Sequence, residues 1–290
     1  MSRAWIEDGL VAHLSGSELQ SALLEELARR AKRAPHEVLA QYKRDRFVMP
    51  AAGDQRTSVA VDMHLLAAAA EFEAIELSPV APLGTCSSIA PTSQHRILSA
   101  LRMTEVVSDP TNVLALEIAR RWQTVRSDLH LVTSQRVIRA QPVPNLPGYA
   151  QHFRIFTLAS GGLEQKDHAF TIATLTRHIH TLLDAFDRLE QHGYHFGARR
   201  LDILATPARA ALAKRIAITR IPTKLGTLDK PYYSAGLRYM LWVTAPDGSE
   251  VPIGDGGAFD WLNTLATNRR AVFIASGLGA QLIPLVFAKK

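Results

Sequence analysis

Two extended segments stand on either side of a proline-rich loop and limit the chain to a small set of folds. Residues 129–138 and 152–159 carry β-branched and aromatic side chains, and the loop at 142–148 is rich in proline and ends in glycine. This arrangement predicts a β-hairpin with a long tip. A long amphipathic helix follows at 171–192. A hairpin followed by a helix favours an antiparallel sheet over a parallel one.

The remaining segments extend this pattern. Apolar spacing, proline and glycine predict an alternation of helices and strands along the rest of the chain. The expected helices are 57–70, 111–125, 208–216 and 258–267, and the expected strands are 72–80, 200–204, 233–244 and 271–275. We therefore expect an α+β fold, in which a mainly antiparallel sheet is flanked by helices that gather on one side.

The first part of the chain differs from the rest. Leucines at helical spacing predict a helix at 17–32, with Ser17 as its cap, and Pro35 opens a second short helix that reaches Tyr42. The run from Pro50 to Asp54 has the composition of a linker. Residues 1–53 are thus predicted to form a small helical extension with its linker, and residues 54–290 the core.

Composition narrows the function classes. The net charge of +6 and pI of about 9.6 favour anionic partners such as nucleotides or RNA. The single cysteine, Cys86, excludes an internal disulfide and a cysteine-cluster metal site, and we expect a small buried residue rather than a nucleophile. No apolar run approaches the ~20 residues of a membrane span. We expect a cytoplasmic protein with no membrane contact and no metal site.

The hairpin carries the strongest motif. Residues 135–141, Gln-Arg-Val-Ile-Arg-Ala-Gln, and the strand that returns from His152 resemble motif 2 of the class II aminoacyl-tRNA synthetases, most closely the histidyl type. Arg139 matches the arginine of the family's Phe-Arg-x-Glu core, Gln141 replaces its glutamate, and Phe153 matches the phenylalanine that stacks on adenine. The resemblance implies Arg139 as the catalytic cation at the α-phosphate of ATP, with Gln141 and Phe153 as nucleotide-binding residues. A sheet arginine that reaches solvent and a core phenylalanine are the alternative.

A turn before the helix at 111–125 resembles a second family element. Residues 107–113, Val-Ser-Asp-Pro-Thr-Asn-Val, are similar to the Arg-Pro-Glu-Gly-Thr turn, whose glutamate holds the α-amino group of the substrate. The resemblance implies that Asp109 and Thr111 bind substrate. The alternative is that Asp109 caps the helix, with Pro110 at its first position.

Two later segments resemble the part of the family that selects histidine. Tyr232 and Tyr233 are similar to a Tyr-Tyr-Thr-Gly stretch on a central strand, although the arginine before it is missing and Lys224 or Lys230 would have to replace its charge. The glycine-rich run before Asp260 is similar to a Gly-Gly-Arg-Tyr-Asp turn. These matches imply that the two tyrosines and Asp260 bind an amino acid. Ordinary strand aromatics and an ordinary glycine turn are the alternatives.

Two flanking segments complete the resemblance. The helix 57–70 and the residues 72–79 resemble motif 1, which builds the family's dimer interface, so a homodimer is expected. Residues 273–282 resemble motif 3, but Gln281 stands where the family has the arginine that binds the γ-phosphate of ATP. A neutral amide there replaces a charge-assisted bond that would be about twice as strong.

Together these matches imply a core like that of the class II synthetases and biotin ligases, without an anticodon-binding domain. We expect a ligand-binding, regulatory paralogue that resembles the regulatory subunit of ATP phosphoribosyltransferase and binds an amino acid or nucleotide. The alternative is an adenylate-forming ligase that uses ATP with Mg²⁺ and transfers an amino acid to a non-tRNA acceptor, with Arg238, Arg269 or Arg270 at the γ-phosphate. An RNA-binding accessory protein, suggested by the basic run 29–33, is the third hypothesis.

Overall fold

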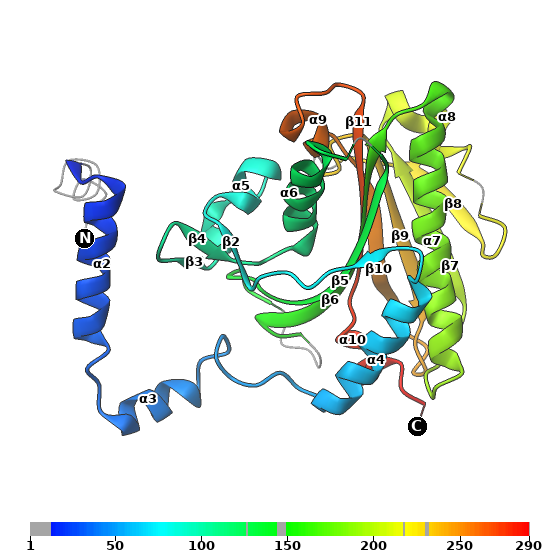
Figure 1. Ribbon diagram of the computed structural model, residues 1–290. Coiled ribbons are helices and arrows are strands. Elements are labelled where there is room, and N and C mark those ends of the chain that lie inside the picture. Colours follow the sequence, from blue (N-terminus) through cyan, green and yellow to red (C-terminus); the bar gives the residue numbers. More distant parts are fainter. Residues whose placement is uncertain (1–12, 126, 144–148, 217, 230–231, 290) are drawn as a thin grey trace.

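The computed structural model describes residues 13–125, 127–143, 149–216, 218–229 and 232–289. The core is an eight-stranded sheet with the order β1-β5-β6-β11-β10-β9-β7-β8, and a three-stranded sheet, β2-β4-β3, lies beside it (Figure 1). The described helices are α2 (Gly16–Arg30), α3 (Pro35–Tyr42), α4 (Gln55–Ala68), α5 (Thr85–Ile89), α6 (Pro110–Trp122), α7 (Ala169–Glu190), α8 (Ala210–Ala213), α9 (Trp261–Leu265) and α10 (Leu282–Val286). The described strands are β1 (Glu73–Ala74), β2 (Val80–Pro82), β3 (Ser99–Ala100), β4 (Thr104–Val106), β5 (Leu129–Ile138), β6 (His152–Leu163), β7 (Arg199–Ala205), β8 (Thr223–Thr227), β9 (Leu237–Thr244), β10 (Glu250–Phe259) and β11 (Ala271–Leu278).

The predicted hairpin is confirmed and supplies two neighbouring strands of the large sheet. β5 and β6 pair antiparallel from Leu129 opposite Gly161 to Ile138 opposite His152. The tip of the hairpin, residues 144–148, lies outside the described residues. β11, β10, β9 and β7 continue the sheet in antiparallel pairs, and the described parallel pairs are β1 with β5 and β7 with β8. The predicted α+β fold with a mainly antiparallel sheet is therefore confirmed.

Helices cover both faces of the large sheet, so the expectation that they gather on one side is wrong. α4 and α7 pack on one face, where Leu158 of β6 joins a core that contains Ile179 and Phe186. α6 and α9 pack on the other face, where the next residue, Ala159, joins a core that contains Ile118. Neighbouring strand residues point to opposite faces. A strand such as β6, whose side chains are buried on both faces of the sheet, therefore needs helices packed against both faces.

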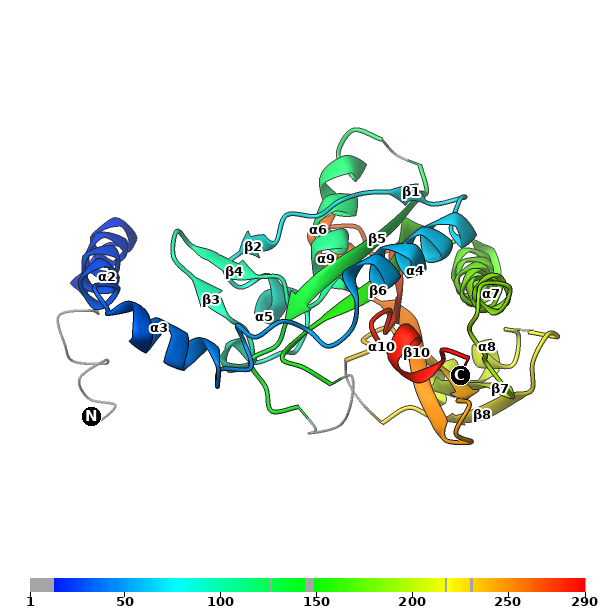
Figure 2. The ribbon, with the colours of Figure 1, turned by 90° about the horizontal axis from the view of Figure 1, so that it is seen from below.

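The extension at the start of the chain has no buried residues in α2 or α3. Figures 1 and 2 show both helices away from the sheet. The following segment touches the hairpin, where His152 Nε2 lies 2.7 Å from the carbonyl oxygen of Met49. α2 begins at Gly16, and Ser15 forms a capping box with Glu18, so the prediction that Ser17 caps this helix is wrong. None of the described helices is both long and apolar enough to cross a membrane.

Three predicted elements differ from the structure. The expected strand 72–80 is two short strands, β1 and β2, which belong to different sheets. The glycine run 254–257, expected as a turn, lies inside β10 and pairs with both β9 and β11. Tyr232 and Tyr233, expected on a strand, lie in the turn that precedes β9. Glycine in β10 provides room for neighbouring groups rather than for a turn, because a Cβ on Gly256 would meet the side chains of Ser276 and Tyr239.

Candidate functional site

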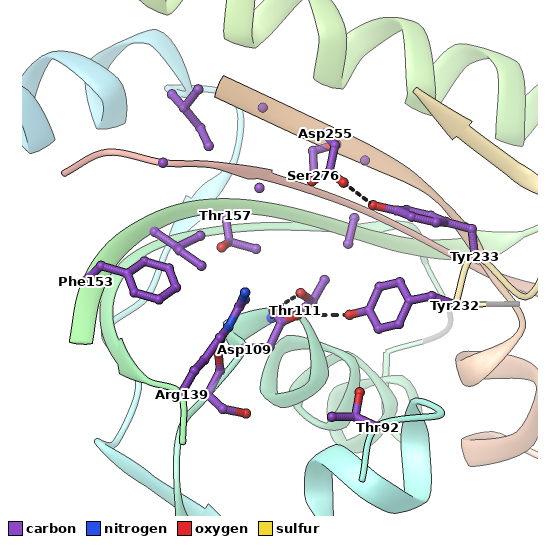
Figure 3. Close-up of a pocket in the computed structure, with 18 of the residues that line it drawn as sticks. Thr92, Asp109, Thr111, Arg139, Phe153, Thr157, Tyr232, Tyr233, Asp255 and Ser276 are labelled. Atoms are coloured by element: carbon purple, nitrogen blue, oxygen red, sulfur yellow. Dashed lines mark hydrogen bonds between the residues drawn. The ribbon is translucent and has the colours of Figure 1, made fainter. Parts of the chain in front are cut away.

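A pocket of about 580 Å³ opens on the face of the sheet that α6 also covers. Its walls come from the hairpin, the start of α6, the turn before β9, and β9 to β11 (Figure 3). The volume is within the range of small-molecule binding sites, about 300–1,000 Å³. The predicted site residues in its wall are Asp109, Thr111, Arg139, Gln141, Phe153, Tyr232 and Tyr233.

The structure brings together Arg139 and Phe153, the pair on which the motif 2 resemblance depends. The guanidinium carbon of Arg139 lies 5.1 Å from the centre of the Phe153 ring, and Nε donates to the carbonyl oxygen of Ser108 at 3.1 Å. Figure 3 shows both side chains facing into the same cavity. The antiparallel hairpin explains the meeting, because the backbone N–H of Arg139 donates to the carbonyl of Gln151, two residues before Phe153.

Asp109 has the capping role that the sequence offered as an alternative. Its Oδ1 accepts from the backbone N–H of Thr111 at 3.0 Å and from the Thr111 hydroxyl. Its Oδ2 accepts from the hydroxyl of Tyr232 at 2.9 Å. Burial, followed by the Asp109 carboxylate, raises the pKa of Tyr232 well above its ordinary value. The phenol is therefore a donor that ties the turn before β9 to the start of α6.

A second phenol and carboxylate meet on the opposite wall. The hydroxyl of Tyr233 donates to Asp255 Oδ2 at 2.6 Å, and Arg238 Nη2 donates to the same oxygen at 2.8 Å. The guanidinium carbon of Arg238 lies 5.1 Å from the centre of the Tyr233 ring. Burial and the Asp255 carboxylate raise the pKa of Tyr233, so this phenol is also a donor. Among the described residues, Asp255 Oδ1 has no hydrogen-bond partner in the protein.

Sequence reasoning missed Asp255 and Thr157. Asp255 is the charged residue within the run Gly-Asp-Gly-Gly at 254–257, and that contrast was the available sign of a site residue. Thr157 gives no such sign on a strand, where threonine is common. Its hydroxyl is buried, has no partner within the described part of the chain, and belongs to a residue of the pocket wall.

Two predicted site residues lie elsewhere. Gln281 is 7% exposed and is absent from the pocket wall; its Oε1 accepts from Arg136 at 3.2 Å, near α4. Asp260 accepts from the Ser234 hydroxyl and lines a different, smaller cavity. Of the suggested charge replacements, Lys224 lies on the exposed strand β8, and Lys230 lies outside the described residues.

Cys86 lies in the pocket wall as a buried thiol. Its sulfur accepts from Ser108 Oγ at 3.3 Å and from Asn112 Nδ2 at 3.0 Å, and burial raises its pKa. A thiol with a raised pKa is a poor nucleophile, so the surroundings of Cys86 agree with the expected role as a small buried residue.

No cluster of three or more histidine, cysteine or acidic side chains in the described ranges is arranged to hold a metal ion.

No family model matches the sequence, and no curated protein matches it.

Comparison with solved structures shows that the chain has the class II aminoacyl-tRNA synthetase-like fold. An ATP phosphoribosyltransferase regulatory subunit/histidyl-tRNA synthetase from Bacillus halodurans aligns with a TM-score of 0.59 and 12% identity, over 81% of each chain. Histidyl-tRNA synthetase from S. aureus aligns with a TM-score of 0.58 and 11% identity, over 80% of this chain and 65% of that one. A histidine–tRNA ligase subunit from Alicyclobacillus acidocaldarius aligns with a TM-score of 0.58 and 13% identity, over 82% and 96%. The expected similarity in fold to the histidyl-tRNA synthetase core is confirmed.

Proposed function

We propose that this protein binds an amino acid or a nucleotide in the main pocket and has a regulatory role that does not include tRNA charging. The description of the Bacillus halodurans structure names both a regulatory subunit and a synthetase. The fold is therefore compatible with either role, and the regulatory proposal rests on the side chains of this chain's pocket.

The placement of Arg139 beside Phe153 is the observation that carries the binding proposal. Within the described residues, Arg139 uses only Nε, toward Ser108, and its Nη groups are free. A guanidinium fork binds a carboxylate or phosphate through two parallel bonds. The adjoining Phe153 ring offers a flat face to a planar or apolar group. An amino acid or a nucleotide carries both kinds of group.

The surroundings of Gln281 support the non-charging role. The amide faces Arg136 and lies outside the pocket wall. Of the suggested replacement cations, Arg238 is neutralised by Asp255 in an ion pair, and Arg269 and Arg270 are absent from the wall. None of these three suggested arginines is therefore available to the last phosphate of a triphosphate in this pocket.

The position of Arg139 also favours a second candidate, the adenylate-forming ligase that uses ATP with Mg²⁺. This candidate predicts amino-acid-dependent exchange of pyrophosphate into ATP. Measuring that exchange with each amino acid separates the two candidates, because a signal that disappears in Arg139→Gln would replace the regulatory proposal with the ligase.

A thermal-shift screen of the twenty amino acids and the common nucleotides tests the binding proposal, because a ligand that binds only the native state raises the unfolding temperature. We expect at least one ligand whose Kd rises about tenfold or more in Arg139→Gln, the loss of one charge-assisted contact. Arg120→Gln is the matched control, since Arg120 is an exposed arginine on α6 that pairs with Glu117. A screen without any ligand, or equal losses in both variants, would contradict the proposal.

We also propose a homodimer that forms through α4 and β1, in the cytoplasm. Val59 and Met63, one helical turn apart on α4, are 57% and 60% exposed. A dimer that covers them would dissociate in Met63→Glu, which sedimentation velocity measures. A wild-type protein that sediments as a monomer would reject this assembly.

The binding of RNA, expected from the net charge, stays a prediction.

A further inference from the structure

A second cavity, of about 210 Å³, lies at the end of the sheet where α8 and α9 are found (Figure 1). It is separate from the Arg139 wall of the main pocket. Its polar wall residues are Glu164, His168, Thr171, Arg209, Asp260, Asn263 and Arg269. The volume is below the range of about 300–1,000 Å³ for larger ligands, so it suits a small one.

The two arginines of this wall have no carboxylate partner among the residues that the structure describes. Arg209 Nη1 lies 3.3 Å from Nε2 of His168, and no side-chain hydrogen bond or ion pair is present for Arg269 within the described ranges. Because a guanidinium can only donate, Nε2 of His168 is the acceptor of this bond. Its other nitrogen, Nδ1, lies 3.2 Å from Glu164 Oε2. Within the described ranges, neither guanidinium therefore forms an ion pair with a carboxylate.

Two more arginines bind the backbone of residues 164–168, the loop that borders this cavity. Arg215 Nη1 donates to the carbonyl oxygen of Asp167 at 2.7 Å, and Arg270 Nη2 donates to the carbonyl oxygen of Glu164 at 3.1 Å. Carbonyl groups are neutral, so these bonds hold the loop without cancelling the positive charge. In contrast, the arginines at 120, 121, 154, 199, 200, 220 and 238 all form ion pairs with carboxylates.

The carboxylates near this cavity are already engaged. Glu164 accepts from the backbone N–H and the hydroxyl of Thr171, in the first turn of α7, and from His168. Asp260 accepts from the Ser234 hydroxyl. Neither acid pairs with an arginine among the described residues. Their hydroxyl and backbone partners are neutral, so both acids keep their negative charge, but the oxygens in these contacts are already occupied by hydrogen bonds. The guanidinium donors of Arg209 and Arg269 are open to a ligand.

We propose that this cavity is an effector site for a small phosphate-bearing anion, of the class of phosphate, pyrophosphate or a small phosphate ester. Arginine forks match phosphate oxygens in geometry and charge. Arg209 and Arg269 bind the anion, and Arg215 and Arg270 add to the local positive potential.

The two cavities share wall residues. We infer from this that an anion in the second cavity acts on the main pocket. Phe259 lines both cavities. The turn before β9 presents Tyr232 and Tyr233 to the main pocket and Ala235 to the second cavity. An anion that orders this turn changes the position of both phenols, and any coupling between the two sites is reciprocal.

Calorimetric titration of the full chain with pyrophosphate tests the site. We expect the Kd to rise about tenfold or more in Arg209→Gln and in Arg269→Gln, with Arg120→Gln unchanged. Circular dichroism confirms that each variant is folded. The absence of binding up to about 10 mM pyrophosphate, or an equal loss in Arg120→Gln, would overturn the proposal.

Hydrogen exchange of residues 232–240 tests the coupling without any ligand of the main pocket. We expect slower exchange in the wild type when pyrophosphate is added, and no change in Arg209→Gln. Binding that leaves this exchange unaltered would overturn the effector role. These outcomes do not depend on the amino-acid and nucleotide screen, so failure of the main-pocket proposal and failure of this one are distinguishable.

Discussion

At the scale of single residues, two phenol–carboxylate pairs define the polar walls of the main pocket. Tyr232 joins Asp109, and Tyr233 joins Asp255. In both pairs the phenol donates, so the tyrosines hold the carboxylates in place. Both oxygens of Asp109 accept hydrogen bonds within the protein, whereas Oδ1 of Asp255 has no hydrogen-bond partner among the described residues.

Replacement of Asp255 tests whether this arrangement also stabilises the fold. Asp255→Ala leaves the Tyr233 hydroxyl and the half-buried Arg238 without their acceptor, and we expect the free energy of unfolding to fall by about 1–2 kcal/mol. Urea denaturation measures the change. Glu250→Ala is the control on the same strand, since its exposed pair with Arg200 contributes about 0–1 kcal/mol. Equal losses in the two variants would contradict the prediction.

A buried histidine gives the fold a dependence on pH. His178 on α7 is completely buried, with Nε2 at 2.8 Å from Ser160 Oγ and Nδ1 at 2.9 Å from Ser276 Oγ. Burial, followed by the positive charges of His130 and Arg177, lowers its pKa from 6.5 to about 3. The ring is therefore neutral in the folded protein at pH values where the unfolded chain binds a proton.

The sign of the pH effect follows from this shift. The pKa of His178 is lower in the folded protein than in the unfolded chain. The contribution of the neutral ring to the free energy of unfolding is therefore fully present above pH 6.5 and is lost as the pH falls towards 3. The loss reaches about 1.4 kcal/mol per pH unit at most. Urea denaturation at about pH 7 and about pH 5.5 measures it, and His178→Gln should show a smaller loss than the wild type. An identical loss in the variant would assign the effect to other groups.

At the scale of secondary-structure elements, β6 is packed between α6 on one face and α7 on the other. Gly161 of β6 allows the approach of α6, because a Cβ there would lie 2.5 Å from Ile118 Cγ2 and 2.8 Å from Leu262 Cδ2. The adjoining glycine, Gly162, is equally close to Phe170 in the first turn of α7. This pair of glycines lets both helix layers contact the same strand.

The substitution Gly161→Ala tests that contact. The added methyl group must displace Ile118 or Leu262, and overpacking of this kind costs about 1–3 kcal/mol. Gly277→Ala on the neighbouring strand β11 is the control, because its Cβ would meet Ile155 at an ordinary 3.7 Å. Chemical denaturation of both variants gives the comparison. Equal stability of the two would show that α6 can move away from the sheet.

At the scale of the whole molecule, the extension is set apart from the core. The helices α2 and α3 contain no buried residue, and Leu27, Val38 and Leu39 are each 50% exposed. The contacts to the core come from the next segment, where Arg46 Nη2 donates to the carbonyl oxygen of Tyr149 and Met49 contacts His152. The stability of the core therefore does not depend on the two helices.

Deletion of residues 1–44 provides the test. We expect the unfolding temperature of the core to change by less than about 4 °C, because a shift of that size corresponds to about 1 kcal/mol. Differential scanning calorimetry measures the change, and the retained Arg46 and Met49 keep the contacts to the hairpin. A larger drop would mean that the helices stabilise the core in solution.

The predicted residues whose contacts the sequence anticipated are close along the chain or belong to one hairpin. Arg139 and Phe153 meet because a single antiparallel register brings them together. Asp109 could be recognised as a helix cap because capping involves only the next few residues. Gln281 and Asp260 were assigned by motif alone, and their side chains turn toward Arg136 and Ser234, which lie far away in the sequence.

The order of apolar, proline and glycine residues alone was sufficient for the hairpin, the long helix α7 and the antiparallel class of the sheet, because periodicity and turn chemistry act over short stretches. The packing of distant segments determined which faces the helices cover, the pairing of Asp255 with Tyr233 and Arg238, and the cavity beside Arg209 and Arg269. These features depend on contacts between different strands and helices, and no short-range pattern of residues encodes a contact whose partner belongs to another element.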